Sequence, residues 1–281
     1  MSLPRVTYII CHQNYQDTLP AAIKSAKSQT YPTHICVIDD GSDDQDSVDD
    51  IITDELFANQ AEQMSQEDGI IYRENANYTA IFLPKASGPS HARNIGIQRL
   101  WERTDFFAIL DADDENYPQK VEVLVRIMLQ SPEIGVAYAD YDILNVDTGE
   151  VYREYKEPYD QFRLQQECIV HSGALISKAA LAHVHDENGF YDVNMRTCED
   201  FDLWIRISKD FMIYHVPHSL SLVRVHSRNS TFSVQNEIWQ QNWQRIQQKH
   251  NGSFQTCYSS QAKETQRNTC HIHYLGREPC I

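Results

Sequence analysis

The chain is short of basic residues, and this shortage limits what it can bind. It has 24 Lys and Arg against 40 Asp and Glu among 281 residues, which gives a formal net charge of −16. A surface this acidic disfavours non-specific binding to nucleic acid or to an anionic membrane. We therefore expect no nucleic-acid partner, and an anionic substrate would need a local cation.

Long apolar runs and a cysteine framework are also missing. No run approaches the roughly 18 apolar residues of a membrane span, and the first residues lack the apolar core of a signal peptide. The seven cysteines have no spacing typical of a disulfide framework. We expect a cytoplasmic protein without a transmembrane segment, and peripheral association with a membrane stays open.

Two glycine-rich phosphate-binding motifs are absent. No Gly-x-Gly-x-x-Gly follows the apolar run 6–11, which disfavours a dinucleotide cofactor, and no Gly-x-x-x-x-Gly-Lys-[Ser/Thr] occurs, which excludes a P-loop. We also expect no zinc site. The tail contains side chains that could bind zinc, namely Cys257, Cys270, His271, His273 and Cys280, but their spacing fits no common zinc finger.

What the first half of the chain does contain is an alternation of apolar runs and amphipathic helical patterns. The polar segment 58–79, with one apolar pair at 70–71, is expected to be a surface excursion, and it could include a short edge strand. Strands are predicted at 6–11, 35–38, 81–83 and 106–110. Because helical patterns follow these strands, we predict an α/β fold with a mainly parallel, Rossmann-like sheet flanked by helices.

Beyond residue 130 the alternation becomes irregular. A last helix is predicted from the spacing of Trp239, Trp243 and Ile246, which we interpret as core anchors rather than sugar platforms. The other predictions are a strand at 135–144, helices at 177–184 and 199–208, and strands at 211–216 and 220–225 joined by a turn at Pro217.

Two of the predicted strands end in acidic clusters. The strand 106–110 runs into Asp111-Ala112-Asp113-Asp114, and the strand 35–38 runs into Asp39-Asp40. The carboxyl ends of parallel strands meet at one edge of a sheet, where ligands bind. Clustered carboxylates repel each other without a cation, and Mg²⁺ commonly shares carboxylates with a substrate phosphate. The pattern predicts a metal site for a phosphorylated substrate, although Asp-Asp-Gly-Ser is also ordinary turn chemistry.

A third acidic pair, Glu199-Asp200, precedes the apolar residues of the helix predicted at 199–208. Acidic residues in a first helical turn are favoured by the helix dipole, so this pair alone has a purely structural explanation. Taken with the two acidic strand ends, it also supplies a candidate general base.

The order of these features is more specific than any one of them. It comprises Val6–Ile10, Asn14, Gln29–Pro32, Val37–Ser42, Ala92–Gly96, Leu110–Asp114, Glu199–Trp204 and Arg224–His226. In this order the motifs resemble those of family 2 glycosyltransferases of the GT-A fold, over about residues 5–230. The resemblance implies inverting transfer of a sugar from a nucleoside diphosphate sugar, with a UDP-sugar favoured and Mn²⁺ or Mg²⁺ as cofactor.

The resemblance also implies roles for individual residues. Asp200 matches the catalytic base, with Glu199 beside it. The metal ligands that the resemblance implies are Asp113, Asp114 and His226. Which of Asp111, Asp113 and Asp114 contacts the ribose and which binds the metal is left open. The implied donor-binding residues are Cys11, Asn14, Asp39, Asp40, Arg93, Asp111, Ala112 and Asp113.

Two departures from the family pattern affect the interpretation. Cys11-His12-Gln13 replaces the residues usual after the first strand, which makes the base contacts less certain. The Gln-x-x-Arg-Trp of processive synthases is absent, since 240–245 reads Gln-Gln-Asn-Trp-Gln-Arg. We therefore expect transfer of a single sugar, to a saccharide, a lipid-linked acceptor or another hydroxyl.

Two alternatives remain open. A nucleotidyltransferase would want a Gly-rich loop with Arg and Lys after the first strand, which Cys11–Asn14 is not. A non-catalytic module that binds a sugar nucleotide or a glycan could share the fold.

The resemblance also suggests a domain division. We expect a GT-A domain over 1–232, with a nucleotide-sugar-binding half to about 130 and an irregular acceptor-side half from about 131. A helical, poorly ordered extension over 233–281 would follow it. His171-Ser172-Gly173 would border the acceptor pocket or form an ordinary loop.

Overall fold

The computed structural model describes residues 3–58 and 60–250. The zinc-competent tail residues and the extension beyond residue 250 lie outside this part. The described strands are β1 (Val6–His12), β2 (Thr33–Asp39), β3 (Gln63–Glu67), β4 (Ile70–Glu74), β5 (Tyr78–Phe82), β6 (Phe106–Asp111), β7 (Glu115–Asn116), β8 (Ile134–Asn145), β9 (Val151–Glu154), β10 (Leu175–Ser177) and β11 (Met212–Val225). The described α-helices are α1 (Leu19–Lys27), α2 (Gln45–Ile52), α3 (Pro89–Arg99), α4 (Lys120–Met128), α5 (Gln161–Leu164), α6 (Lys178–Val184), α7 (Glu199–Ile207), α8 (Ser230–Ser233) and α9 (Asn236–Lys249).

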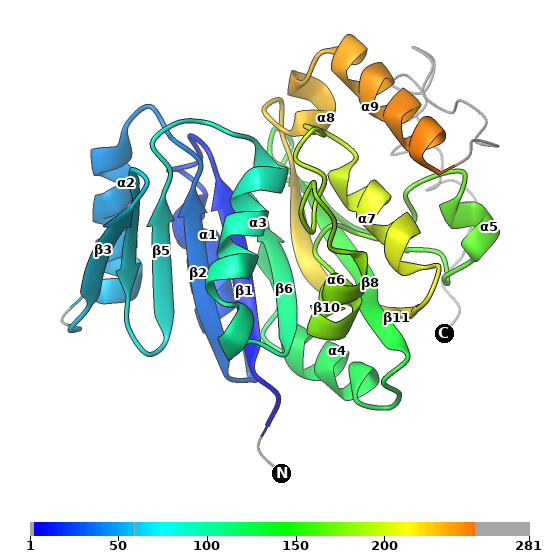
Figure 1. Ribbon diagram of the computed structural model, residues 1–281, viewed down its shortest axis with the longest axis horizontal. Coiled ribbons are helices and arrows are strands. Elements are labelled where there is room, and N and C mark those ends of the chain that lie inside the picture. Colours follow the sequence, from blue (N-terminus) through cyan, green and yellow to red (C-terminus); the bar gives the residue numbers. More distant parts are fainter. Residues whose placement is uncertain (1–2, 59, 251–281) are drawn as a thin grey trace.

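The strands form one mixed sheet with a parallel centre, and the predicted α/β class is confirmed (Figure 1). Its order is β3-β4-β5-β2-β1-β6-β10-β8-β11-β7, with β9 paired to β8. The pairs β5–β2, β2–β1 and β1–β6 are parallel. The short strand β10 runs antiparallel between β6 and β8 and joins the two sides of the sheet.

Helices cover both faces of the sheet, and each face has its own apolar core (Figure 1). The continuous apolar run of β1 serves both, because successive side chains of a strand point to opposite faces. Ile9 packs in the core under α3, α6, α7 and α9, while Tyr8 and Ile10 pack in the core under α1, α2 and α4. A strand buried on both faces explains why this run does not alternate with polar residues.

Two of the predicted segments differ in the structure. The segment 58–79 contains the antiparallel hairpin β3–β4, which pairs with β5. The predicted pair of strands around Pro217 is one strand, β11, with register shifts against β8 between Val216 and Leu222. Such irregularities let a strand accommodate a proline that has no N–H to donate, so Pro217 interrupts the ladder without ending the strand.

The register of the parallel strands brings the two acidic strand ends together. Cys11 at the end of β1 pairs with Asp111 of β6 on one side and with Ile38 of β2 on the other. His12 pairs with Asp39, the last residue of β2. The acidic residues after β2 and β6 therefore lie at the same edge of the sheet, on either side of β1.

Candidate active site

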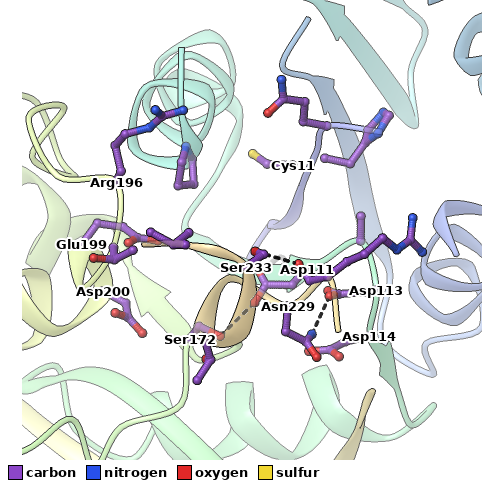
Figure 2. A pocket seen from close by; sticks show the side chains of 18 of the residues that line it. Cys11, Asp111, Asp113, Asp114, Ser172, Arg196, Glu199, Asp200, Asn229 and Ser233 are labelled. Atoms are coloured by element: carbon purple, nitrogen blue, oxygen red, sulfur yellow. Dashed lines mark hydrogen bonds between the residues drawn. The ribbon is translucent and has the colours of Figure 1, made fainter. Parts of the chain in front are cut away.

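A cleft of about 920 Å³ opens at this edge (Figure 2). Nine of the twelve predicted site residues line it, namely Cys11, Asp40, Arg93, Asp111, Ala112, Asp113, Asp114, Glu199 and Asp200. The other three, Asn14, Asp39 and His226, are not part of its lining. Figure 2 shows Glu199 and Asp200 on one side of the cleft and Asp113 and Asp114 on the other, with Asp111 between them.

Asp200 lies in the first turn of α7 and faces the cleft. Burial, reinforced by the neighbouring charge of Glu199, raises the pKa of Asp200 to about 7. One of its oxygens accepts a hydrogen bond from the amide of Phe201, and the other lies 4.0 Å from Sγ of Cys168. An aspartate with its ordinary pKa of about 3.9 would be a weak base, whereas this carboxylate has a pKa suited to general-base catalysis near neutral pH.

The backbone before Asp200 is held in an uncommon conformation. Cys198, immediately before α7, has φ +60° and ψ +17°, the left-handed region that non-glycine residues rarely adopt. The segment is fixed from two sides, since Ser90 Oγ donates to the carbonyl of Met195 and Asn242 Nδ2 donates to Thr197 Oγ1. Strain of this kind costs about 1–3 kcal/mol and persists where the surroundings enforce it.

Arg93 connects the two sides of the cleft. Its Nη2 donates to Asp111 Oδ1 over 2.9 Å and its Nη1 donates to Glu199 Oε1 over 2.6 Å. Although burial opposes it, the adjacent Asp111 and Glu199 carboxylates hold the pKa of Arg93 well above its ordinary value. Burial alone would raise the pKa of Asp111, but Arg93 outweighs this effect and the pKa of Asp111 is lowered. Asp111 is thus a charged residue at the centre of the cleft, held also by a 3.0 Å bond from Ser172 Oγ.

Asp113 and Asp114 have the opposite electrostatic character. Burial, and then the negative charge of the neighbouring aspartates, raises the pKa of Asp113 and raises that of Asp114 well above its ordinary value. Asp114 is 7% exposed and accepts a 2.9 Å hydrogen bond from the amide of Arg224. A carboxylate whose charge is disfavoured by its neighbours gains most from a bound cation.

The residues around Asp113 fit a divalent cation, although no group of three or more His, Cys, Asp or Glu in residues 3–58 and 60–250 forms a ready-made metal site. Asp113 Oδ2 lies 3.2 Å from Nε2 of His226, a buried nitrogen without a hydrogen-bond partner in the described structure. Neighbouring ligands of an octahedral ion, each at about 2.1 Å, lie about 3 Å apart. Asn229 Nδ2 donates to the same Asp113 oxygen over 3.0 Å and holds the carboxylate in place.

The acidic residues after β2 organise the neighbouring loops. Both oxygens of Asp40 accept 2.7 Å hydrogen bonds, from the amides of Ser87 and Gly88. Asp39 is buried and accepts hydrogen bonds from Ser42 and Gln45. Asp40 thereby fixes the entry to α3, and Asp39 fixes the loop that follows β2.

Asn14, in the loop after β1, is exposed and joins that loop to the one after β2. Its Nδ2 donates a hydrogen bond to Asp43 Oδ2, and its Oδ1 accepts one from the Asp43 amide. Asn14 has φ +59°, a left-handed conformation that asparagine tolerates better than most residues. It therefore supports the cleft wall from outside.

Comparison with known proteins decides the family. Residues 7–184 match the profile described as Glycosyl transferase family 2. The chain belongs to this family. It is a glycosyltransferase, and the enzyme class expected from the motifs is confirmed.

Relatives of this glycosyltransferase have the same designation. An uncharacterized glycosyltransferase of Rickettsia prowazekii is 25% identical over 246 residues, which cover 84% of this chain and 68% of the relative. Among solved structures, S. aureus TarS 1–349 in complex with UDP-GlcNAc superposes with a TM-score of 0.61 at 14% identity, covering 96% of this chain and 73% of TarS. The mannosyltransferase PcManGT from Pyrobaculum calidifontis, in complex with GDP-Man and Mn²⁺, superposes with a TM-score of 0.60 at 15% identity. The match covers 98% of this chain and 71% of PcManGT. At these identities the structural likeness shows the fold, and it confirms the expected GT-A architecture.

The glycosyltransferase cleft also contains residues outside the set of twelve predicted site residues. His171, expected either to border the acceptor pocket or to form an ordinary loop, lines the cleft beside Tyr141, with ring centroids 4.5 Å apart. Burial lowers the pKa of His171 to about 3. Trp243 is 3% exposed and belongs to the core, as expected, whereas Trp239 lines the cleft as well as packing against the core. Arg196 lines the cleft four residues before Asp200. The sequence does not predict Arg196, because it precedes the Glu199-Asp200 pair without belonging to a motif.

Proposed function

We propose that this glycosyltransferase moves a single sugar from a nucleoside diphosphate sugar, with a UDP-sugar favoured, to an acceptor hydroxyl with inversion. The observation that carries the proposal is one cleft that contains both a carboxylate with a pKa of about 7 and a cluster of three aspartates. Support comes from the similar folds solved with UDP-GlcNAc and with GDP-Man and Mn²⁺.

Asp200 is the proposed general base. Inversion requires a nucleophile that attacks from the face opposite the leaving group, and Asp200 lies across the cleft from Asp113 (Figure 2). Its Oδ2 would accept the proton of the acceptor hydroxyl as the bond to the anomeric carbon forms. Glu199 is held by Arg93, and we assign it to positioning rather than to proton transfer.

Asp113 and His226 are the proposed metal ligands from the protein, and Asp111 is assigned to the sugar or the ribose. Mn²⁺ or Mg²⁺ held there would neutralise the charge that develops on the departing diphosphate. Asp114, buried and bonded to the Arg224 amide, would hold the loop that presents Asp113. Arg93 orients Asp111, and Asn229 orients Asp113.

The nucleobase side of the cleft is assigned to Cys11, Ala112 and Asp40, all of which line it. We propose that Asn14 and Asp39 act on the donor indirectly, through the two loops that they hold. Burial raises the pKa of Cys11 to about 12, so its thiol stays protonated against a base.

The acceptor would be a saccharide, a lipid-linked molecule or another hydroxyl. Within residues 3–58 and 60–250, no helix has the length and apolarity needed to cross a bilayer. A cytoplasmic location remains part of the proposal, since Cys11, Cys36, Cys168 and Cys198 are free thiols and disulfides are rare in reducing compartments.

A thermal-shift screen of nucleoside diphosphates and their sugars, with and without Mn²⁺, tests the proposal. A ligand at 100 times its Kd stabilises the native state by about 2.7 kcal/mol. We expect one nucleotide to stabilise the wild type only in the presence of metal, and Asp113→Asn to lose that response. Stabilisation by none of them would overturn the proposal, and binding without any metal-dependent hydrolysis of the sugar nucleotide would indicate a non-catalytic module.

A further inference from the structure

Arg196 differs from the other arginines of the cleft in its charge environment. Of the 13 arginines within residues 3–58 and 60–250, 12 form an ion pair with Asp or Glu, and Arg196 forms none. The other arginines of the cleft lining are paired with acidic residues: Arg93 with Asp111 and Glu199, Arg224 with Glu115, and Arg228 with Asp17. In a chain with a net charge of −16, a guanidinium left without an acidic partner requires an explanation.

The backbone of Arg196 is fixed although its side chain is exposed. Its two neighbours, Met195 and Thr197, are 1% and 3% exposed, and both are tied to other elements by the bonds from Ser90 and Asn242. Because the segment that carries it is held in place, Arg196 would lose less conformational entropy on binding a ligand than an arginine on a free loop. This arrangement is typical of a binding residue.

The position of Arg196 indicates which part of a substrate it would meet. Figure 2 shows Arg196 on the side of the cleft that carries Glu199 and Asp200, away from Asp113 and Asp114. A diphosphate held near Asp113 would therefore lie on the other side. The start of α3 also lines the cleft and, with no acidic residue in its first turn, adds no charge that could satisfy Arg196.

We propose that Arg196 binds an anionic group, a phosphate or a carboxylate, on the acceptor. The inference rests on the proposed function, because it takes the side of Asp200 as the acceptor side. Guanidinium forms bidentate, charge-assisted hydrogen bonds with both groups, so the two chemistries share one site. The positive charge of Arg196 would thus favour an anionic acceptor over a neutral one.

The test is NMR of the arginine Nε–Hε signals in full-length protein saturated with a nucleoside diphosphate and Mg²⁺, with Arg196 assigned by its absence in Arg196→Lys. Glucose 6-phosphate and glucuronate are the anionic probes, and glucose is the neutral control. We expect a saturable shift of the Arg196 signal with both anions and none with glucose. By calorimetry, Arg196→Gln should bind glucose 6-phosphate about tenfold to a hundredfold more weakly than wild type. Arg126→Gln, which removes the same charge from an exposed ion pair on α4, should bind it as wild type does.

Other outcomes overturn the inference. An Arg196 signal that moves with neither anion, or equally with glucose, contradicts charge recognition. A response to UDP-glucuronate but not to UDP-glucose or the free anions assigns the anion to the transferred sugar instead. If no nucleotide with Mg²⁺ moves the Arg93 signal, the proposed function itself fails, and that result is separate from the anion result.

Discussion

Nη1 of Arg93 donates a 2.6 Å hydrogen bond to Oε1 of Glu199, and this contact distinguishes two adjacent carboxylates. Glu199 is neutralised by a buried guanidinium, whereas Asp200 is paired with no basic residue among those described. The pair therefore has one member suited to hold the site together and one suited to accept a proton. Three predictions test the chemistry of this cleft, and a fourth tests the packing of α9.

The first concerns the proposed base. Asp200→Asn should lower kcat for sugar transfer by about 10²- to 10⁴-fold, because the amide cannot accept the proton of the acceptor. Glu199→Gln keeps an oxygen that can accept the hydrogen bond from Arg93, so its kcat should fall much less. Initial rates of nucleoside diphosphate release, measured with an acceptor found by screening, compare the two variants. Equal losses in both would contradict the separate roles.

The second concerns pH. The base must be ionised, so kcat/KM should rise with pH and level off above about 7, the pKa of Asp200. After burial, the charge of Glu199 is the largest cause of that raised pKa. Glu199→Gln should therefore move the rising limb to lower pH. A profile that is flat from about pH 5.5 to 8 in wild type would rule out an essential base with this pKa.

The third concerns the metal. Asp113→Asn and His226→Ala should each weaken Mn²⁺ binding in the presence of nucleotide by about 10- to 100-fold, and Asn229→Ala by an amount near the lower end of that range. Calorimetric titration of Mn²⁺ gives these affinities. Asp210→Asn, an exposed acidic residue paired with His183, is the control and should bind Mn²⁺ normally. A larger loss in Asp114→Asn than in Asp113→Asn would reverse the assignment of the ligand.

The fourth concerns α9. Trp243 is 3% exposed and stacks on Phe201 of α7, with ring centroids 5.4 Å apart. Trp243→Ala should lower the free energy of unfolding by about 3–5 kcal/mol, as truncation of a large core aromatic does. Urea denaturation measures the loss, with the exposed Gln240→Ala on the same helix as control. A change below about 1 kcal/mol would show that α9 contributes little to the fold.

The sequence predicts well those parts of the fold that depend on local pattern. The strands around Ile9, Val37 and Ile109 are apolar runs buried on both faces, and each appears where it was expected. The hairpin strand β3 is not predicted because its five residues are all exposed and one apolar side chain, Met64, is too little to show a period. Strand β10 was missed because three residues are too few to show a period.

The candidate site was predictable as a set of residue types but not as an arrangement. Arg93 and Glu199 are separated by 106 positions, so only the folded chain shows that they touch. The pKa of Asp200 likewise depends on burial that no motif encodes. The division at residue 232 remains a prediction. Across that position, Asn242 bonds to Thr197, and Lys249 and His250 bond to Asp202.

The single hydrogen-bonded sheet has a consequence for how substrates enter and leave. Since β10 pairs with β6 on one side and with β8 on the other, the strands on both sides of it belong to one continuous hydrogen-bonded ladder. Opening by rotation of two lobes would break these ladders. We therefore expect substrate access to depend on segments outside the sheet, among them the stretch 228–239, most of whose residues line the cleft beyond the end of β11.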